Sequence, residues 1–296
     1  MKKYFIILIS LLMMSCTSKN EIGTHMHPIR FALVPGQDSV VLMKNSELLK
    51  TWILQQTGLH VTMQVPTSYI AVVEAFGSKR VDLAILNTFG YILAHDKYGA
   101  EALLIGVNGE RSEYWGQIIT KDPGIKSLQD LNGKKFAYVD PASTSGYVLP
   151  AKLIKDAKIK LGETVFAGKH DSVVTMVYQG RVDAGATYHT PAENGEPQDA
   201  RRLVLAQYPD VFKKVRILQL TGSIPSDPVV FRKDLPPEIR AKLISALKSF
   251  GSTPEGEKAL RNLYLLTGFK DCTDKTYDPV RKMLLDLSKN VQELVK

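Results

Sequence analysis

The segment Phe136-Ala-Tyr-Val-Asp-Pro-Ala-Ser-Thr-Ser-Gly-Tyr147 joins a short apolar strand to the start of a helix. The first backbone N–H groups of a helix have no intrahelical acceptor, and the helix dipole adds positive charge there. Ser143, Thr144 and Ser145 place three hydroxyl donors at this point, and Gly146 lets the backbone approach a ligand. The segment therefore predicts an oxyanion site. The alternative is that one hydroxyl only caps the helix.

Strand and helix patterns alternate along the rest of the chain. In the first half, apolar strands are expected at Ile29–Val34, His60–Val65, Val81–Leu86 and Leu103–Val107. Helices are expected between them at Val40–Gln56, Tyr69–Phe76 and Phe89–Tyr98. The second half repeats the alternation, with strands at Tyr114–Thr120, Phe136–Val139, Val182–Thr187 and Val215–Leu220 and helices at Tyr147–Ala157 and His170–Gln179. This order predicts an α/β fold with mainly parallel sheets.

The length of 296 residues accommodates two lobes of ~100–150 residues each. We expect the second lobe to be inserted into the first, so that lobe 1 holds residues 28–112 and 227–296 and lobe 2 holds residues 113–226. The chain then crosses between the lobes near Glu113–Tyr114 and again near Ser226–Asp227. Two crossings form a hinge, and hinged lobes close around ligands.

The N-terminus has the pattern of a secretory signal. Lys2 and Lys3 precede an apolar run over residues 4–14, and Ser15 and Cys16 follow. The run is too short for a permanent membrane span, which needs ~20 apolar residues. We interpret residues 1–15 as a signal peptide and residues 16–27 as a polar tether.

Cys16 stands where a bacterial lipoprotein carries its lipid, and the segment resembles a lipobox. This resemblance implies a lipoprotein anchored to a membrane in the periplasm or at the cell surface. The alternative is a plain secreted protein that is cut near this point. With Cys16 lipidated, Cys272 has no partner and no disulfide is expected.

The chemistry of the sequence is that of a binding protein. The chain contains no Walker-type loop, no nucleophile elbow and no metal-binding spacing of the HExxH or CxxC kind, so we expect no catalytic residues, metal or cofactor. The formal charge of +8 suits an anion binder but is not specific. The basic residues are spread out, which argues against a nucleic-acid partner.

Val139–Pro150 resembles the signature of the phosphonate-, phosphite- and phosphate-binding periplasmic proteins of ABC importers. Ser127–Lys134, Val182–Ala186 and Ile224–Arg232 match the same family, in the same order, and the similarity runs from about Arg30 to Ser249. The resemblance implies a two-lobed type II periplasmic binding protein fold. It also implies a monomer that binds a small oxyanion and delivers it to an ABC permease and its ATPase.

The resemblance also implies which side chains hold the ligand. Its oxygens would be bound by hydroxyls of the serine-rich segment, by an imidazole at the start of the next helix and by phenols from both lobes: Ser143, Thr144, Ser145, His170, Tyr69 and Tyr114. Each has an alternative. The two tyrosines could be core aromatics, and His170 could be only a helix-terminus residue.

Asp227 matches the acidic ligand contact of the family. A carboxylate beside an anion is repulsive in a poorly solvated cleft, unless the ligand carries a proton that the two can share. Phosphate, phosphite and phosphonates can be protonated near neutral pH, whereas sulfate cannot. Asp227 would therefore select protonatable oxyanions. Its alternative is a turn residue before Pro228.

One position departs from the family. Relatives usually place an acidic residue after the segment that is Gly185-Ala-Thr187 here, and aminophosphonate binders use it to hold the ammonium group. This chain has Tyr188-His189-Thr190 instead. The change argues against an aminoalkylphosphonate, and His189 could donate to a ligand oxygen. A bare oxyanion or a small uncharged substituent is then favoured.

Two other functions fit less well or cannot be separated. An oxyanion-sensing protein that reports to a membrane histidine kinase would use the same binding chemistry. An extracytoplasmic phosphatase would need a metal cluster or an activated nucleophile, and neither pattern is present in the sequence.

Overall fold

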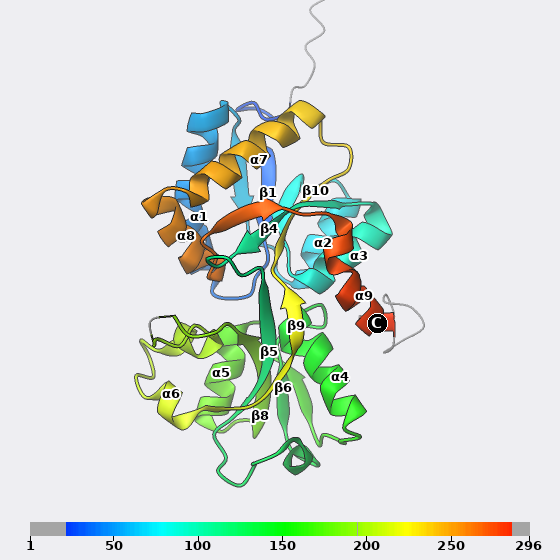
Figure 1. Cartoon of the computed structure of the whole chain (residues 1–296), viewed down its shortest axis with the longest axis vertical. Helices are drawn as coiled ribbons and strands as arrows, with labels where there is room; N and C mark the ends of the chain where they lie inside the picture. The colour runs from blue at the N-terminus through cyan, green and yellow to red at the C-terminus, as the bar shows by residue number, and fades with distance from the viewer. Residues whose placement is uncertain (1–21, 194, 286–296) are drawn as a thin grey trace, which may run out of the picture.

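A computed structural model describes residues 22–193 and 195–285. The chain forms two α/β lobes, which lie one above the other in Figure 1, and this confirms the predicted two-lobed fold. The signal peptide and Cys16 lie outside the described residues. Among the helices that are described, none is both long and apolar enough to span a bilayer.

Lobe 1 is built on a six-stranded sheet. Its strands, in order across the sheet, are β11 (Gly268–Asp271), β4 (Glu101–Val107), β10 (Pro228–Phe231), β3 (Leu83–Ile85), β1 (Ile29–Leu33) and β2 (Val61–Gln64). Strand β1 pairs in parallel with β2 and β3, while β10 runs antiparallel to both β3 and β4. Phe31, Leu83 and Phe231 are paired in register and fully buried on one face of this sheet. Their neighbours Ala32, Ala84 and Val230 are fully buried on the other face, so both faces are covered.

Lobe 2 is built on a five-stranded sheet. Its order is β7 (Thr164–Phe166), β6 (Phe136–Tyr138), β8 (Ala184–His189), β5 (Glu113–Thr120) and β9 (Arg216–Pro225). Strands β5 and β9 are the two connections that run between the lobes in Figure 1. They pair with each other antiparallel over most of their length, so the hinge is a two-stranded ribbon.

The prediction of mainly parallel sheets is wrong. Strands β6, β7 and β8 are parallel, but β5 is antiparallel to both of its neighbours, and β10 and β11 add antiparallel pairs to lobe 1. The reason is the double crossing: a chain that leaves lobe 1 in β5 must come back in β9 and enter lobe 1 from the opposite direction in β10. Hydrophobic alternation carries no information about strand direction.

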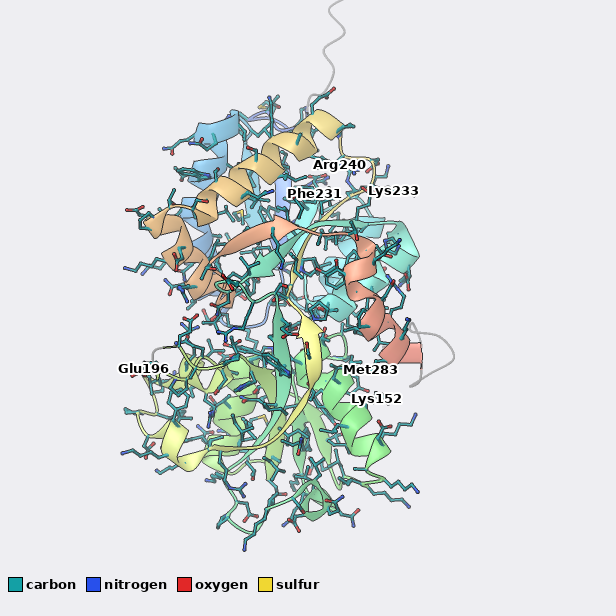
Figure 2. All side chains as sticks on the ribbon, viewed as in Figure 1. Lys152, Glu196, Phe231, Lys233, Arg240 and Met283 are labelled. Atoms are coloured by element: carbon teal, nitrogen blue, oxygen red, sulfur yellow. The ribbon has the colours of Figure 1, made fainter. Side chains whose placement is uncertain are left out.

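The helices of lobe 1 cover its sheet and line its side of the hinge. They are α1 (Ser39–Thr57), α2 (Tyr69–Gly77), α3 (Thr88–Tyr98), α7 (Pro237–Gly251), α8 (Pro254–Tyr264) and α9 (Asp278–Leu285), with a short turn η4 (Asp274–Tyr277) before α9. Helix α1 begins where the Asp38 carboxylate accepts from the N–H of Val40, and it ends at Gly58, which adopts φ of +71°. Helix α9 reaches lobe 2: Met283, labelled in Figure 2, lies 3.7 Å from where a Cβ on Gly222 would stand.

The helices of lobe 2 are fewer. They are α4 (Leu149–Asp156), α5 (His170–Gln179) and α6 (Val211–Lys214), with the short turns η1 (Leu128–Leu131) and η3 (Ala200–Val204). Helix α4 does not start at Tyr147 as expected. A wide π-helical turn, η2 (Thr144–Val148), precedes it, so the helical segment begins within the three hydroxyl residues.

Asp82 fastens the centre of the lobe 1 sheet. Its side chain is fully buried just before β3, and it accepts two hydrogen bonds from the guanidinium of Arg30, both at 2.9 Å. A third comes from the guanidinium of Arg232 at 2.9 Å. The carboxylate therefore ties β1, β3 and the end of β10 together, and β10 leads directly back to the hinge.

We predict that Asp82→Asn lowers the free energy of unfolding by about 3 kcal/mol, because it removes the buried counter-charge of Arg30 and leaves Arg232 paired with Asp234 alone. Urea denaturation followed by circular dichroism measures the change. Asp271→Asn is the matched control, since Asp271 pairs with Lys248 at the surface and should cost less than about 1 kcal/mol. Equal midpoints for the two variants would contradict the role given to Asp82.

Candidate binding site

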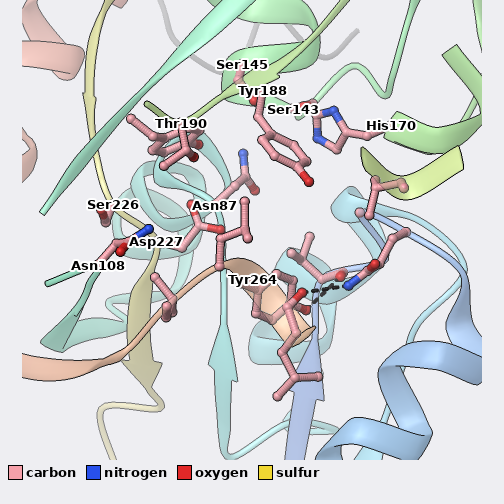
Figure 3. A pocket seen from close by; sticks show the side chains of 18 of the residues that line it. Asn87, Asn108, Ser143, Ser145, His170, Tyr188, Thr190, Ser226, Asp227 and Tyr264 are labelled. Atoms are coloured by element: carbon pink, nitrogen blue, oxygen red, sulfur yellow. Dashed lines mark hydrogen bonds between the residues drawn. The ribbon is translucent and has the colours of Figure 1, made fainter. Parts of the chain in front are cut away.

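A cavity of about 90 Å³ lies between the lobes, beside the hinge strands (Figure 3). It is small compared with pockets for drug-sized ligands, which measure ~300–1,000 Å³. Most of the side chains on its wall that can hydrogen-bond are uncharged, and they come from both lobes: Tyr69, Asn87, Asn108, Tyr114, Ser143, Ser145, His170, Tyr188, Thr190 and Tyr264. Asp227 and Glu113 are the acidic residues on the wall, and Arg202 is the basic one apart from His170, among the described residues.

The two predicted tyrosines lie on the cavity wall as buried hydrogen-bonding groups. Tyr69 begins α2, and its hydroxyl is hydrogen-bonded to that of Ser143 in the opposite lobe. Tyr114, in the hinge strand β5, is hydrogen-bonded to Ser145 and Asp227. Burial raises the pKa of both phenols well above the ordinary value, and the negative charge of Asp227 adds to the shift. Both tyrosines therefore keep their protons and can donate.

Close packing around the Tyr69 hydroxyl accounts for the presence of glycine at position 36. A Cβ on Gly36 would stand 3.1 Å from the Tyr69 hydroxyl and 3.7 Å from the ring of His170. The distance to His170 is an ordinary van der Waals contact, but a Cβ at position 36 would press on the Tyr69 hydroxyl. Glycine therefore leaves the Tyr69 hydroxyl undisturbed at the cavity wall.

Asp227 stands between β9 and β10, at the second crossing of the chain. Its backbone oxygen accepts from the N–H of Gly106, which fixes it against β4. Burial raises the pKa of its carboxyl to about 7, although the hydrogen bond from Tyr114 lowers it in part. Its Oδ1 has no hydrogen-bond partner among the described residues. An acid with a free buried oxygen and a pKa near neutrality can either hold a proton or accept one.

The three consecutive hydroxyls have separate partners. Ser143 caps the helical segment by accepting from the N–H of Gly146 at 3.1 Å, and both Ser143 and Ser145 line the cavity. Thr144 does not line it. Its Oγ1 accepts from Asn87 Nδ2 and from the N–H of Phe89, both at 2.8 Å. The expected ligand contact of Thr144 is therefore replaced by a contact between the lobes, because this side chain faces the start of α3.

Gly146 also has a different role from the one expected. A Cβ at this position would stand 2.4 Å from Cγ2 of Val139, and the residue is absent from the cavity wall. Its N–H is already donated to Ser143. Glycine is needed so that the turn can pack on the end of β6, and the prediction that it faces the ligand is wrong.

His170 opens α5 and lies on the cavity wall. Its backbone N–H donates across the cleft to the carbonyl of Gly36 at 3.1 Å. Burial lowers the pKa of its imidazole to about 3, so the ring is neutral at ordinary pH and carries one N–H. Its Nδ1 has no partner among the described residues. An unused ring nitrogen beside an oxyanion site can serve as a donor.

His189 lies away from the cavity. Neighbouring residues of a strand point to opposite faces, and Tyr188 of β8 takes the face towards the cavity. The His189 ring packs instead against Trp115, with centroids 6.4 Å apart. The expected contact between His189 and a ligand oxygen does not occur in this arrangement, and Tyr188 occupies that wall.

Several wall residues were not found from the sequence. Asn87 stands two residues after the end of β3 and immediately before α3, the same strand-to-helix position as Ser143, and this parallel could have identified it. Asn108 follows β4; it is buried, and neither its Nδ2 nor its Oδ1 has a partner among the described residues. Tyr264, at the end of α8, donates to the carbonyl of Val34 at 2.9 Å. Nothing in the sequence near Asn108 or Tyr264 indicates a site.

Donors from two lobes that converge on one small interlobe cavity define a two-lobed solute-binding protein. Residues 31–277 match the family model described as the periplasmic substrate-binding protein of phosphonate ABC transporters. The chain belongs to this family, whose members bind solutes and are not enzymes.

Curated relatives agree with this assignment. The chain is 31% identical to the phosphate-import protein PhnD of Mycolicibacterium smegmatis over 188 residues, which is 55% of either protein. It is 26% identical to the phosphonates-binding periplasmic protein of Escherichia coli over 78% of this chain and 68% of the relative. A probable phosphite-binding protein of Prochlorococcus marinus is 23% identical over 68% of this chain and 70% of the relative.

Solved structures show the same fold. The binding component of a phosphonate ABC transporter from Pseudomonas aeruginosa superimposes with a TM-score of 0.78 at 23% identity, covering 90% of this chain and 87% of that one. PhnD1 of Prochlorococcus marinus in complex with methylphosphonate gives a TM-score of 0.74 at 19% identity, covering 88% and 98%.

We predict that Asp227 makes the stability of the ligand-free protein fall as the pH rises. Below pH ~4 the carboxyl is protonated in both folded and unfolded chains and has no effect. Between pH ~4 and ~7 only the folded chain keeps the proton, so stability is lost with rising pH, by up to about 4 kcal/mol at pH 8. The gain in melting temperature of Asp227→Asn over the unmodified chain should be small at pH 4.5 and grow until about pH 7.

Thermal melts at half-unit pH steps measure this difference. Asp156→Asn is the control, because Asp156 is an exposed acid paired with Lys152, and its difference should not grow above pH 5. A difference for Asp227→Asn that is flat with pH would contradict a buried acid.

Proposed function

We propose that this protein captures a small phosphorus oxyanion (phosphonate, phosphite or phosphate) between its lobes and passes it to an ABC permease and ATPase. The observation that carries the proposal is the pairing of neutral donors with one buried acid. Tyr69, Ser143, Ser145 and His170 face the same cavity as Asp227, whose carboxyl has a pKa of about 7 and an oxygen without a partner.

The donors suit an oxyanion because each offers one hydrogen bond to a different oxygen. Thr144 and Ser145 hold the first positions of the helical segment, where backbone N–H groups lack intrahelical acceptors. Such a helix start favours an anion, and Ser145 lies on the cavity wall. A tetrahedral ligand would then exchange its water for hydroxyls, an imidazole N–H and backbone amides.

Asp227 adds the requirement for a proton. A ligand that brings a proton, or a site that keeps its own, forms one short O–H···O bond where two bare anions would repel each other. Sulfate brings no proton near neutral pH. It would have to face either a charged carboxylate or the cost of protonating one.

The wall opposite Asp227 favours a small substituent without positive charge. Tyr188 stands where an acid would hold an ammonium group, and its hydroxyl is hydrogen-bonded to Arg202, a cation. Glu113 also lines the cavity, but its exposed carboxylate already accepts from the Ser223 hydroxyl. The relative from Prochlorococcus marinus is in complex with methylphosphonate, a ligand of this size and charge.

We predict that isothermal titration at pH 7 finds phosphite, methylphosphonate or phosphate bound at least tenfold more tightly than 2-aminoethylphosphonate and at least about a hundredfold more tightly than sulfate. The first difference comes from the missing acid, and the second comes from the proton needed at Asp227. Tighter binding of 2-aminoethylphosphonate than of all three small oxyanions would contradict the proposal that the wall at Tyr188 disfavours a positively charged substituent.

Asp227→Asn separates the proton requirement from general weakening of the site. The amide can donate to an anion without a proton, so the preference for phosphite over sulfate should shrink by about tenfold or more. Asp156→Asn should leave the ratio unchanged. If Asp227→Asn left the ratio of phosphite affinity to sulfate affinity unchanged, Asp227 would not be the residue that discriminates between the two anions.

We also propose that Cys16 carries the lipid that holds the protein at the membrane. The support is the charged start, the apolar run and the cysteine that follows Ser15. In cells fed labelled palmitate, the full-length chain should take up label and partition into detergent, and Cys16→Ser should lose both properties. Cys272→Ser is the control and should keep them. Label retained by Cys16→Ser would place the lipid elsewhere.

A further inference from the structure

A second hollow, of about 440 Å³, opens at the outer edge of the cleft. It shares Arg202 and Leu265 with the inner cavity, so it is the continuation of that cavity towards solvent. Its other lining residues come from both lobes: Glu193 and Gln198 from lobe 2, and Lys258, Arg261 and Asn262 from lobe 1. We call this hollow the mouth of the cleft.

The charges at the mouth are not balanced. The Arg261 guanidinium is paired with the carboxylates of Glu193 at 2.6 Å and Glu257 at 2.9 Å. Arg202 and Lys258 have no carboxylate partner among the described residues. The Arg202 guanidinium is hydrogen-bonded to the hydroxyl of Tyr188, and Lys258 is exposed. Two positive charges therefore face the mouth without neutralisation.

The two cations belong to different lobes. Arg202 lies in η3 of lobe 2, and Lys258 lies in α8 of lobe 1. In Figure 2 the loop labelled at Glu196 marks the side of lobe 2 that faces α8, and the Glu193–Arg261 ion pair joins the lobes here. Arg202 and Lys258 both line the hollow through which an anion would enter from this side.

The inner cavity attracts an anion poorly over a distance, so positive charge at the mouth would speed its association. Apart from Arg202, which lines both hollows, its donors are neutral and act only at hydrogen-bond distance. Asp227, once it has lost its proton, carries a negative charge that acts over several ångströms and repels an approaching anion. Charges of the opposite sign at the rim of a cleft raise the association rate of a charged ligand, and the effect decreases with salt because the Debye length is only ~8–10 Å.

We propose that Arg202 and Lys258 form an anion-capture site at the mouth, which attracts the oxyanion before the lobes close on it. The inference rests on the proposed oxyanion ligand and adds a second, transient site for the same ligand. Lys258 serves association alone, because it does not reach the inner wall. Arg202 also touches the inner cavity, so it affects both association and release.

Stopped-flow measurements with methylphosphonate, followed by tryptophan fluorescence, test the proposal at several salt concentrations. Lys258→Ala should lower the association rate about two- to threefold at low salt, and Lys258→Glu should lower it further, with the dissociation rate unchanged in both. The dependence of the rate on salt should also flatten. Lys242→Ala is the matched control, since Lys242 is an exposed lysine of α7, on the side of lobe 1 away from lobe 2 (Figure 1).

Lys258 variants that associate as fast as Lys242→Ala at every salt concentration would overturn the capture site and leave the proposed function intact. An unmodified chain that binds none of phosphite, methylphosphonate and phosphate in titration would overturn both. Lys258 is exposed, and its side chain forms no hydrogen bond or ion pair among the described residues. Its variants should therefore keep the melting temperature of the unmodified chain, which checks that they fold.

Discussion

The structure depends on one constraint: a carboxylate, Asp227, is buried at the hinge without a cation beside it. Isolated buried charges are so costly that such a group holds a proton or finds a proton donor. Among the described residues, the side-chain hydrogen bond that lowers its pKa comes from Tyr114 in the hinge strand β5. The backbone of Asp227 is held in place, because its carbonyl accepts from the N–H of Gly106 and the next residue starts β10.

Closure of the lobes completes the environment of this acid. Asn87 and Phe89 at the start of α3 donate to Thr144, and His170 donates its backbone N–H to Gly36. These bonds join the two lobes around the cavity. The three consecutive hydroxyls thus have different roles. Ser143 caps the helical segment, Thr144 is hydrogen-bonded to the opposite lobe, and Ser145 lines the cavity together with Ser143.

The sequence predicted the elements of the fold better than their directions. The two crossings near Tyr114 and Asp227 fall at the start of β5 and between β9 and β10, because hydrophobic runs and their breaks are local properties of the chain. Strand direction in β10 and β11 depends on which lobe the chain returns to, and no local pattern encodes that.

In the site too, features that depend on local sequence could be predicted, and features that depend on distant packing could not. Side chains at a strand-to-helix junction, such as Ser143, could be identified from the local signal, and His170 could be identified through the family resemblance. The misplacement of His189 came from a single step of strand register, which sends it to the opposite face from Tyr188. Asn108 and Tyr264 reach the cavity only through the packing of distant segments, so they required the structure.

Although Arg202 lines the same cavity, no cation among the described residues is close enough to Asp227 to lower its pKa, and this follows from the role of Asp227. A lysine or arginine beside the carboxylate would stabilise its charged form and lower its pKa, and the pair would then accept any oxyanion with or without a proton. Discrimination by a proton needs neutral donors around the acid. Attraction of an anion over a distance needs positive charge, and that charge can stand only where it is separated from Asp227. The basic residues Arg202 and Lys258 at the outer edge, and hydroxyls, amides and a neutral imidazole inside, are an arrangement that meets both requirements.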